Sequence, residues 1–210
     1  MRAAFKHVVV LVTAAILVAP SPGMAEGTVL PSASQMASVL QRSLPGPGHT
    51  ALKPIEGTWR VEMTAFMGLG SPDKPVVSTD IICRREWVAG GRYLHDVTEG
   101  TLAGAPYYRE GLLGYSNIDA RYEWVTVDTA NSMMMIYVGE PGSGVRLPIS
   151  VSGTFTDQGW LGKDDVGKPV HMRTVIKIES NDSHVFELYF TPSGGTERLV
   201  DRKVYTRMRE

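Results

Sequence analysis

From Trp59 onward, the chain consists of short β-rich runs separated by turn residues. Apolar and polar side chains alternate within these runs. In the first run, Trp59, Val61 and Met63 share one face, while Arg60 and Glu62 lie on the other. Alternation with a period of two is typical of a strand with one buried face. The pattern predicts ten strands, at residues 57–67, 76–88, 91–100, 106–115, 120–127, 133–139, 147–156, 169–179, 184–191 and 197–207.

Turn residues between the runs predict how the strands connect. Gly90-Gly91, Asn181-Asp182 and Ser193-Gly194-Gly195 tolerate the positive φ of tight hairpins, and residues 157–168 form the longest loop. Even spacing without intervening helices predicts an antiparallel meander. Because an open sheet of ten strands would expose its edges, we expect an all-β, up-and-down β-barrel. A two-sheet sandwich is the main alternative.

Three residues at the two ends of this strand series predict how the barrel closes. Gly57 and Trp59 open the first run, and Arg207 lies near the end of the last. A barrel must join its first strand to its last, and an Arg laid over a Trp ring would stabilise that junction. We therefore expect these three residues to close the barrel rather than to bind a ligand.

The N-terminal residues 1–25 resemble an export signal. Arg2 and Lys6 form a basic start, Val8 to Ala19 are mostly apolar, and small residues precede a cleavage site near Ala25. The apolar run is short for a bilayer span, which needs roughly 20 residues. We expect cleavage, a periplasmic or secreted protein, and no membrane span afterwards. A retained membrane anchor is the alternative.

Residues 26–48 are interpreted as a linker and residues 49–210 as the barrel domain. Within the linker, Met36, Val39 and Leu40 share a helical face, which favours one short N-terminal helix before the Pro- and Gly-rich stop. A further helical turn is compatible with the sequence just before the first strand.

Composition limits the partners that the chain would attract. The formal net charge of −1 gives no field for nucleic acid or an acidic membrane. Cys83 is the only cysteine, so no internal disulfide can form, and we expect a half-buried structural thiol. The oligomeric state stays open between a monomer and a homodimer.

The sequence carries no strong catalytic or metal-binding motif. It has no Gly-x-Ser-x-Gly turn, no phosphate-binding Gly-Lys-Ser/Thr loop and no His-Glu-x-x-His pair. We therefore expect no cofactor and no metal, and favour a binding protein over an enzyme. His184 shares a strand face with Phe186 and Phe190 and could ligate haem in an apolar pocket. We expect it instead at a hairpin end, beside solvent.

Several aromatic and cationic residues are candidates for polar groups inside the barrel. An Arg beside a Tyr can hold a carboxylate in an apolar pocket. Met133 to Met135 alternate along a strand, so at least one faces inward, either filling the core or lining a cavity with Met63 and Met67. Strands with mixed faces leave the inward side open. The candidate ligand-binding residues are Tyr107, Arg109, Trp124, Arg173 and Tyr189.

Several stretches together resemble one bacterial family, the domain of unknown function 1579. They include Pro45 to His49, Gly57 to Trp59, Trp87 to Leu94, His184 to Glu187 and Tyr205 to Arg207, and the likeness spans roughly residues 45–208. The family usually has an acidic residue where this chain has Gly48, and the 157–168 loop is slightly long for the family.

The resemblance implies a calycin-like barrel, the broad fold of lipocalins and fatty-acid-binding proteins. It supplies no catalytic residues. We expect a non-enzymatic barrel that binds a small apolar or amphipathic ligand, such as a small hydrophobic molecule. The alternatives are a structural or interaction barrel with a packed interior, and a haem-binding or enzymatic barrel using His or an Arg/Tyr cluster.

Overall fold

The computed structural model describes residues 31–209, so the predicted signal peptide lies outside the described residues. Three short helical elements precede the strands: α1 (Ala33–Arg42), α2 (Pro47–Thr50) and the 3-10 turn η1 (Lys53–Ile55). The predicted short N-terminal helix is therefore present as α1. None of the helices within residues 31–209 has the length and apolarity that a membrane-spanning helix needs.

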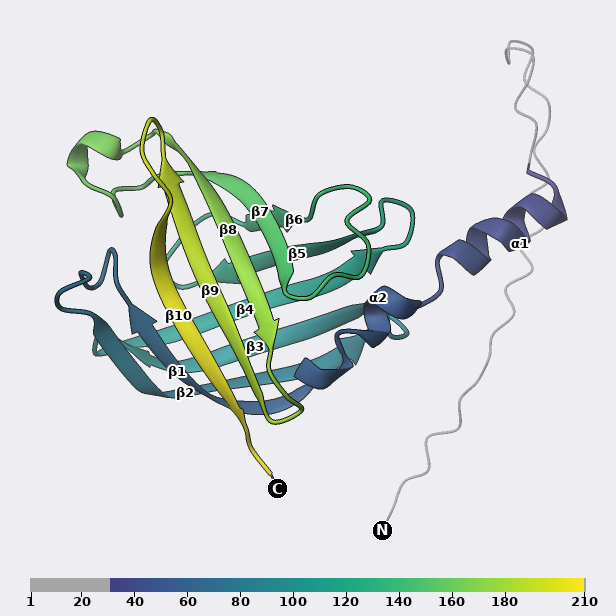
Figure 1. Ribbon diagram of the computed structural model, residues 1–210, viewed down its shortest axis with the longest axis horizontal. Coiled ribbons are helices and arrows are strands. Elements are labelled where there is room, and N and C mark those ends of the chain that lie inside the picture. Colours follow the sequence, from purple (N-terminus) through teal and green to yellow (C-terminus); the bar gives the residue numbers. More distant parts are fainter. Residues whose placement is uncertain (1–30, 210) are drawn as a thin grey trace, which may run out of the picture.

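Ten antiparallel strands form one closed barrel, in which each strand pairs with its chain neighbours and β10 pairs with β1 (Figure 1). The predicted barrel is confirmed, and the two-sheet sandwich was the wrong alternative. The strands are β1 (Gly57–Ala65), β2 (Val76–Val88), β3 (Tyr93–Leu102), β4 (Ala105–Ser116), β5 (Arg121–Asp128), β6 (Met135–Val138), β7 (Ile149–Thr156), β8 (Pro169–Ile178), β9 (Ser183–Pro192) and β10 (Arg198–Arg207).

The alternation along the strands decides which side chains enter the barrel. In β1, Trp59, Val61 and Met63 are buried, as the pattern predicted. In β4 the sequence left both faces open. The structure places Tyr107 and Arg109 inside, at 8% and 6% exposed. Apolar side chains from both halves of the strand series thus meet in one interior core.

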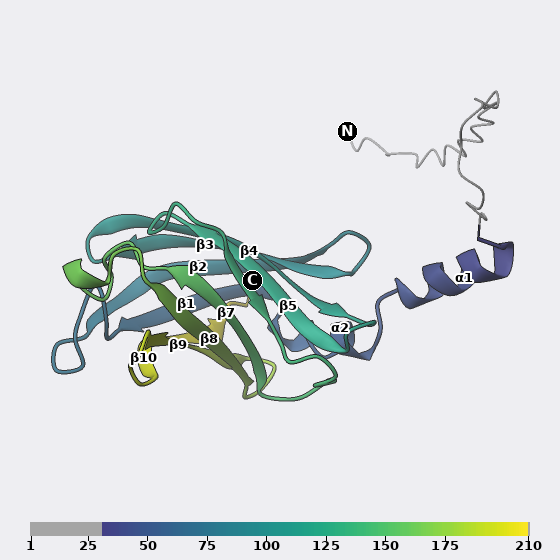
Figure 2. The same cartoon turned by 90° about the horizontal axis from the view of Figure 1, so that it is seen from above.

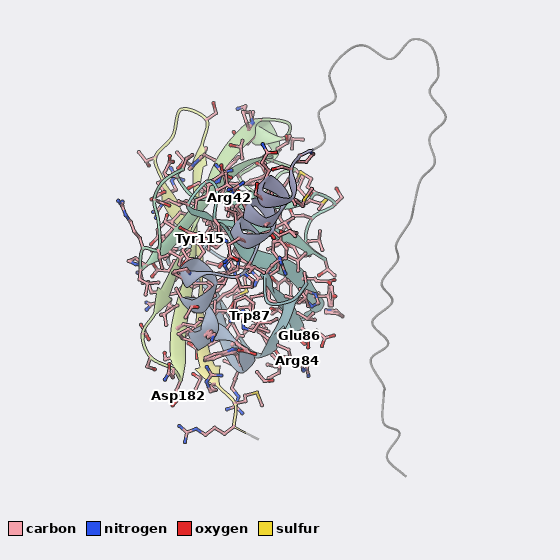
Figure 3. All side chains as sticks on the ribbon, turned by 90° about the vertical axis from the view of Figure 1, so that its right-hand side faces the viewer. Arg42, Arg84, Glu86, Trp87, Tyr115 and Asp182 are labelled. Carbon is pink, nitrogen blue, oxygen red and sulfur yellow. The ribbon has the colours of Figure 1, made fainter. Side chains whose placement is uncertain are left out.

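The helical segment α2–η1 covers one end of the barrel, which we call the helix end (Figure 3). Leu52 and Ile55 are fully buried there, and the Trp59 indole N–H donates to the Ile55 carbonyl over 3.1 Å. Gly48 packs against the Tyr115 ring so closely that an added Cβ would lie 2.2 Å from it. A side chain at this position would therefore push α2 away from the barrel.

Helix α1 stands away from the barrel in both views (Figures 1 and 2). Ser32 begins it with a capping box, in which its hydroxyl accepts from the Gln35 amide. Its apolar residues Met36, Val39 and Leu40 are 45–60% exposed. The helix therefore forms from its own capping and local propensity rather than from burial against the strands.

Candidate functional site: a cavity at the loop end

A cavity of about 110 Å³ lies at the end of the barrel opposite α2. We call this the loop end, because the β1–β2, β5–β6, β7–β8 and β9–β10 connections gather there (Figure 1). The walls are mainly apolar side chains from the strand ends and loops: Met63, Ala65, Met67, Leu69, Leu102, Met135, Phe155, Trp160, Leu161, Leu188, Phe190 and Val200.

The β7–β8 loop supplies one wall through an internal capping arrangement at Asp157. The buried Asp157 carboxylate accepts from the backbone amides of Gly159, Trp160 and Leu161, at 3.0, 2.8 and 3.1 Å. The Trp160 indole N–H then donates to Asn131 Oδ1 in the β5–β6 loop over 3.1 Å. These bonds hold Trp160 and Leu161 against the cavity.

Glycine in the β1–β2 loop lets that loop approach the same wall. Gly68 has φ +75°, and an added Cβ would lie 2.5 Å from the Trp160 ring. Both the conformation and the contact favour glycine at this position. Three loops thus meet around Trp160 at the mouth of the cavity.

Beneath the cavity, the barrel interior is strongly polar. Arg109 Nη2 lies 3.1 Å from Asp96 Oδ1, and the Trp124 indole N–H donates to Asp96 Oδ2 over 3.3 Å. Lys203 forms a second buried ion pair with Asp201. In these two pairs each charge is matched by an opposite charge, which buried charges generally require.

Burial and these ion pairs shift the acidity of the interior groups. Burial lowers the pKa of Lys203, and the neighbouring Asp201 carboxylate opposes that shift. Burial also disfavours the charged form of Arg109, but Asp96 and other neighbours more than offset this and raise its pKa. Burial raises the pKa of Tyr107 and Tyr137 far above the usual range, so both stay neutral hydroxyls.

The structure brings together only some of the predicted ligand-binding residues. Tyr107 lines the cavity, and Arg109 and Trp124 lie in the layer beneath it. Within that layer the Arg109 guanidinium carbon lies 5.1 Å from the centre of the Trp124 ring. These three side chains share the interior, but only Tyr107 is within reach of a molecule in the cavity.

Arg173 and Tyr189 were wrongly predicted to point into the barrel. They are cross-strand partners on the outer face of β8 and β9, with the guanidinium 4.4 Å from the ring centre. Arg173 also makes two bonds to Glu197, at 2.8 and 2.6 Å, and the Tyr189 hydroxyl donates to Glu187. The apolar side chains that alternate with them occupy the interior instead.

His184 was wrongly expected beside solvent, because it is fully buried at the helix end. Its ring stacks on Tyr205 at 4.3 Å and contacts Trp59 edge-on at 4.2 Å, and its Nε2 lies 2.7 Å from Arg85 Nη1. Burial, and then the charges of Arg85 and Arg207, lower its pKa to about 2. This packing leaves no space for haem at His184, and none of the histidines among residues 31–209 lines the loop-end cavity.

The methionines and the single cysteine considered in the sequence analysis take different positions. Met63, Met67 and Met135 line the cavity, whereas Met134 points outward and is 64% exposed. Cys83 is fully buried rather than half-buried, and burial raises the pKa of its thiol. Within residues 31–209, no three His, Cys, Asp or Glu side chains gather as metal ligands would.

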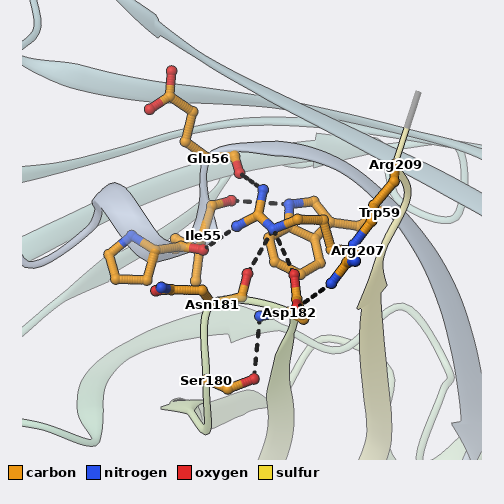
Figure 4. A network of polar contacts seen from close by, with 9 residues as sticks. Ile55, Glu56, Trp59, Ser180, Asn181, Asp182, Arg207 and Arg209 are labelled. Carbon is orange, nitrogen blue, oxygen red and sulfur yellow. Dashed lines mark hydrogen bonds and ion pairs between the residues drawn. The ribbon is translucent and has the colours of Figure 1, made fainter.

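The closure residues meet at the helix end, away from the cavity (Figure 4). Trp59 and Arg207 are cross-strand partners, and Arg207 donates to the carbonyls of Pro54 and Glu56 at 2.7 and 2.8 Å. Gly57 has φ +108°, and an added Cβ would lie 2.7 Å from Arg207 Nη1. The trio thus tethers the N-terminal segment to the last strand.

Sequence reasoning missed four cavity residues, one at the end of β5 and three in loops. Asp128, Asn131, Trp160 and Leu161 all line the cavity, but none was predicted. The available signal was the long β7–β8 loop, in which a Trp-Leu pair interrupts a run of Gly and Asp. Large apolar residues in such a polar loop indicate that the loop folds back onto the protein.

Comparison with known proteins supports the fold and the family. A search of curated protein sequences finds no significant match. Among solved structures, Rv2717c from M. tuberculosis matches with a TM-score of 0.52 at 18% identity, covering 78% of this chain and 99% of that one. EF1p2_mFAP2b bound to DFHBI matches with a TM-score of 0.40 at 10% identity, covering 76% of this chain and 98% of that one.

The family comparison covers the whole strand-forming region. The family described as "Protein of unknown function (DUF1579)" matches residues 44–207, from just before α2 to the end of β10. This range contains the barrel, the loop-end cavity and the closure residues Gly57, Trp59 and Arg207. The chain therefore belongs to the DUF1579 family.

Proposed function

We propose that this protein binds a small apolar or amphipathic molecule in the loop-end cavity. The observation that supports the proposal is a void of about 110 Å³ walled by methionine, aromatic and aliphatic side chains. An apolar cavity of roughly 150 Å³ is enough to bind benzene. The part of the ligand that the cavity encloses would therefore be about as large as benzene or smaller. Any further part of the ligand would extend between the loops.

Methionine in the wall suits such a role. Met63, Met67 and Met135 have flexible, polarisable side chains that can adjust to differently shaped apolar groups. A rigid aliphatic wall would select one shape more strictly. We infer that the cavity accepts a class of related molecules.

The helix-end half of the barrel limits where a ligand can lie. Trp59, His184 and Tyr205 fill that half and are fully buried. In the helix-end half alone, this packing favours the alternative of a structural barrel with a filled interior. A ligand would therefore reach only the loop end, down to the layer formed by Arg109 and Lys203.

We further propose that binding takes place outside the cytoplasm. The support is the basic start, the short apolar run and the small residues before Ala25 in the sequence. A protein without internal disulfides is compatible with this location because its core is large enough to stabilise the fold alone.

Fluorescence from Trp160 tests the proposal directly. A small apolar or amphipathic probe in the cavity would lie against the indole and change its emission. The Val200→Phe variant fills the cavity from its wall and should weaken binding at least about tenfold. The matched Val77→Phe variant adds the same ring to an outer position that is 54% exposed, and should bind as the wild type does.

Native mass spectrometry of protein purified from its own envelope complements the titration. A co-purifying small molecule that is lost in Val200→Phe but kept in Val77→Phe would support the proposal. Equal probe binding by both variants would place the molecule outside the cavity and contradict it.

A further inference from the structure

The charged groups that line the cavity are both acidic, and the other polar groups of the lining are neutral. Asp128, Asp201, Asn131 and the Tyr107 hydroxyl interrupt the apolar wall. No lysine, arginine or histidine belongs to the described lining. A charged group entering this space would therefore meet carboxylates first.

Of the two carboxylates in the cavity wall, Asp128 is the one that can still accept a hydrogen bond from a ligand. Its Oδ1 accepts from the Ala130 amide at 2.8 Å and the Asn131 side chain at 3.0 Å. Within residues 31–209, its Oδ2 has no hydrogen-bond partner and no cation lies within salt-bridge distance of it. Asp201, by contrast, is already paired with Lys203.

Tyr107 provides a second, independent feature on the same wall. It is 8% exposed, lines the cavity, and makes no side-chain hydrogen bond to any described residue. In the β4–β5 ladder, Asp128 is the cross-strand neighbour of Arg109 in backbone register, and Tyr107 lies two positions along from Arg109 on the same inner face. The unpartnered hydroxyl and the carboxylate therefore share one side of the cavity.

The interior cations are held away from the cavity by other partners. Arg109 pairs with Asp96 in the layer beneath, and Lys203 in that layer pairs with Asp201, which also lines the cavity. Arg85 lies nearer the helix end, against His184 and the rings of Phe186 and Tyr205. An anionic ligand in the cavity would have to bury its charge beside Asp128 without direct contact with a cation.

Resting on the proposed function, we propose that the ligand class is amphipathic amines, with a protonated ammonium end. The ammonium donates to Asp128 Oδ2 and to the Tyr107 hydroxyl oxygen, and the hydrocarbon part lies against Met63, Met135 and Phe190. A charge-assisted bond of this kind is stronger than a neutral one. An anionic ligand would have to bury its own carboxylate in the same place. The free energy of desolvating that carboxylate would not be offset, because no cation among the described residues lines the cavity.

Three probes with the same hydrocarbon chain test the inference: hexylamine, hexanol and hexanoate. At pH 7 they present a cation, a neutral hydroxyl and an anion to the same apolar wall. We expect hexylamine to bind the wild type at least about tenfold more tightly than hexanoate, with hexanol in between. Equal or tighter binding of hexanoate would overturn the inference.

Variants test whether the preference for the amine over the alcohol arises at Asp128. Asp128→Asn should lower hexylamine affinity about tenfold and leave hexanol affinity within about twofold of the wild type. Asp73→Asn, which removes an exposed carboxylate in the β1–β2 loop, gives the same change in net charge and should change neither. Tyr107→Phe should weaken hexylamine binding by a smaller factor. An unchanged amine-to-alcohol ratio in Asp128→Asn would refute the assignment.

The outcomes separate this inference from the proposed function. If hexanol binds and Val200→Phe abolishes that binding, the cavity is a ligand site even when the amine is not preferred. In that case only the ligand class is wrong. If none of the three probes binds, both proposals fail.

Discussion

The guanidinium carbon of Arg207 lies 4.1 Å from the centre of the Trp59 ring, and this contact links the last strand of the barrel to the first. The same guanidinium donates to the carbonyls of Pro54 and Glu56, so it also fixes the segment that enters β1. Because the cavity lies at the opposite end of the barrel, we assign this contact to stabilising the fold rather than to binding a ligand.

Replacing Arg207 by alanine should therefore lower stability without changing ligand preference. Loss of the ring contact and of the bonds to the Pro54 and Glu56 carbonyls should reduce the free energy of unfolding by about 3 kcal/mol. Urea denaturation measures this change, and probe titration of the folded variant measures affinity. Arg207→Lys keeps the charge but loses the planar fork, and should recover only part of the stability. A variant that stayed stable but lost its ligand would show that Arg207 belongs to the binding site.

The Gly48–Tyr115 contact predicts a second stability effect. Gly48→Ala would place a Cβ 2.2 Å from the Tyr115 ring and should cost about 2 kcal/mol or more, because α2 must move from the barrel end. Gly46→Ala is a matched control, since its Cβ would meet only the Asn117 side chain at 3.3 Å. Thermal unfolding of both variants measures the difference. Equal losses would contradict the packing argument.

His184 predicts a loss of stability in mild acid. Its pKa is about 2 in the folded state, against the ordinary histidine value of 6.5 in the unfolded chain, so between these pH values the unfolded chain holds one more proton. Stability from this group is complete above pH 6.5 and decreases as the pH falls below it. The loss amounts to about 2 kcal/mol between about pH 8 and pH 5.

Chemical denaturation at about pH 8 and pH 5 measures this His184 effect. His184→Gln should be less stable at the higher pH but should lose less on acidification than the wild type. His49, whose pKa burial also lowers, adds to the same trend in both proteins and does not affect the comparison. His171→Gln, which removes an exposed imidazole from the outer face, is the control for the loss of a histidine outside the core. An identical acid loss in His184→Gln would contradict the assignment.

Cys83 should be chemically inert in the folded protein. The side chain is fully buried and burial raises its pKa, so little thiolate is present or accessible at neutral pH. Alkylation by iodoacetamide at about pH 8 should be slow in buffer and fast in denaturant. Rapid alkylation of the native protein would reveal local opening of β2 that the packing does not explain.

The strand pattern and its turn residues were sufficient to predict the barrel. The second predicted strand and β2 cover the same residues, because the β-rich run that begins at Val76 stops just before the turn residues Gly90-Gly91. For Arg173 and Tyr189, the sequence already contained the pattern that shows which way their side chains point. Both alternate with apolar residues that fill the core, so the period of two placed them outside.

Other features depended on contacts between distant segments. Tyr107 and Tyr108 are equivalent in a single-strand pattern, and the inner face becomes clear only from the ion pair of Arg109 with Asp96 on the preceding strand, β3. The cavity wall at Trp160 depends on three amide bonds to one carboxylate within an irregular loop. Neither relationship has a periodic signature in the sequence.

Methyl NMR of the methionines tests ligand binding at the loop end most directly. Met63, Met67 and Met135 line the cavity, while Met134 points outward from it and Met36 is exposed on α1; these two serve as internal references. Titration with hexylamine should shift the first three methyl signals in a saturable way and leave the two references unchanged. Saturable shifts confined to Met134 or Met36, or no shift of the three cavity methyls, would contradict the account.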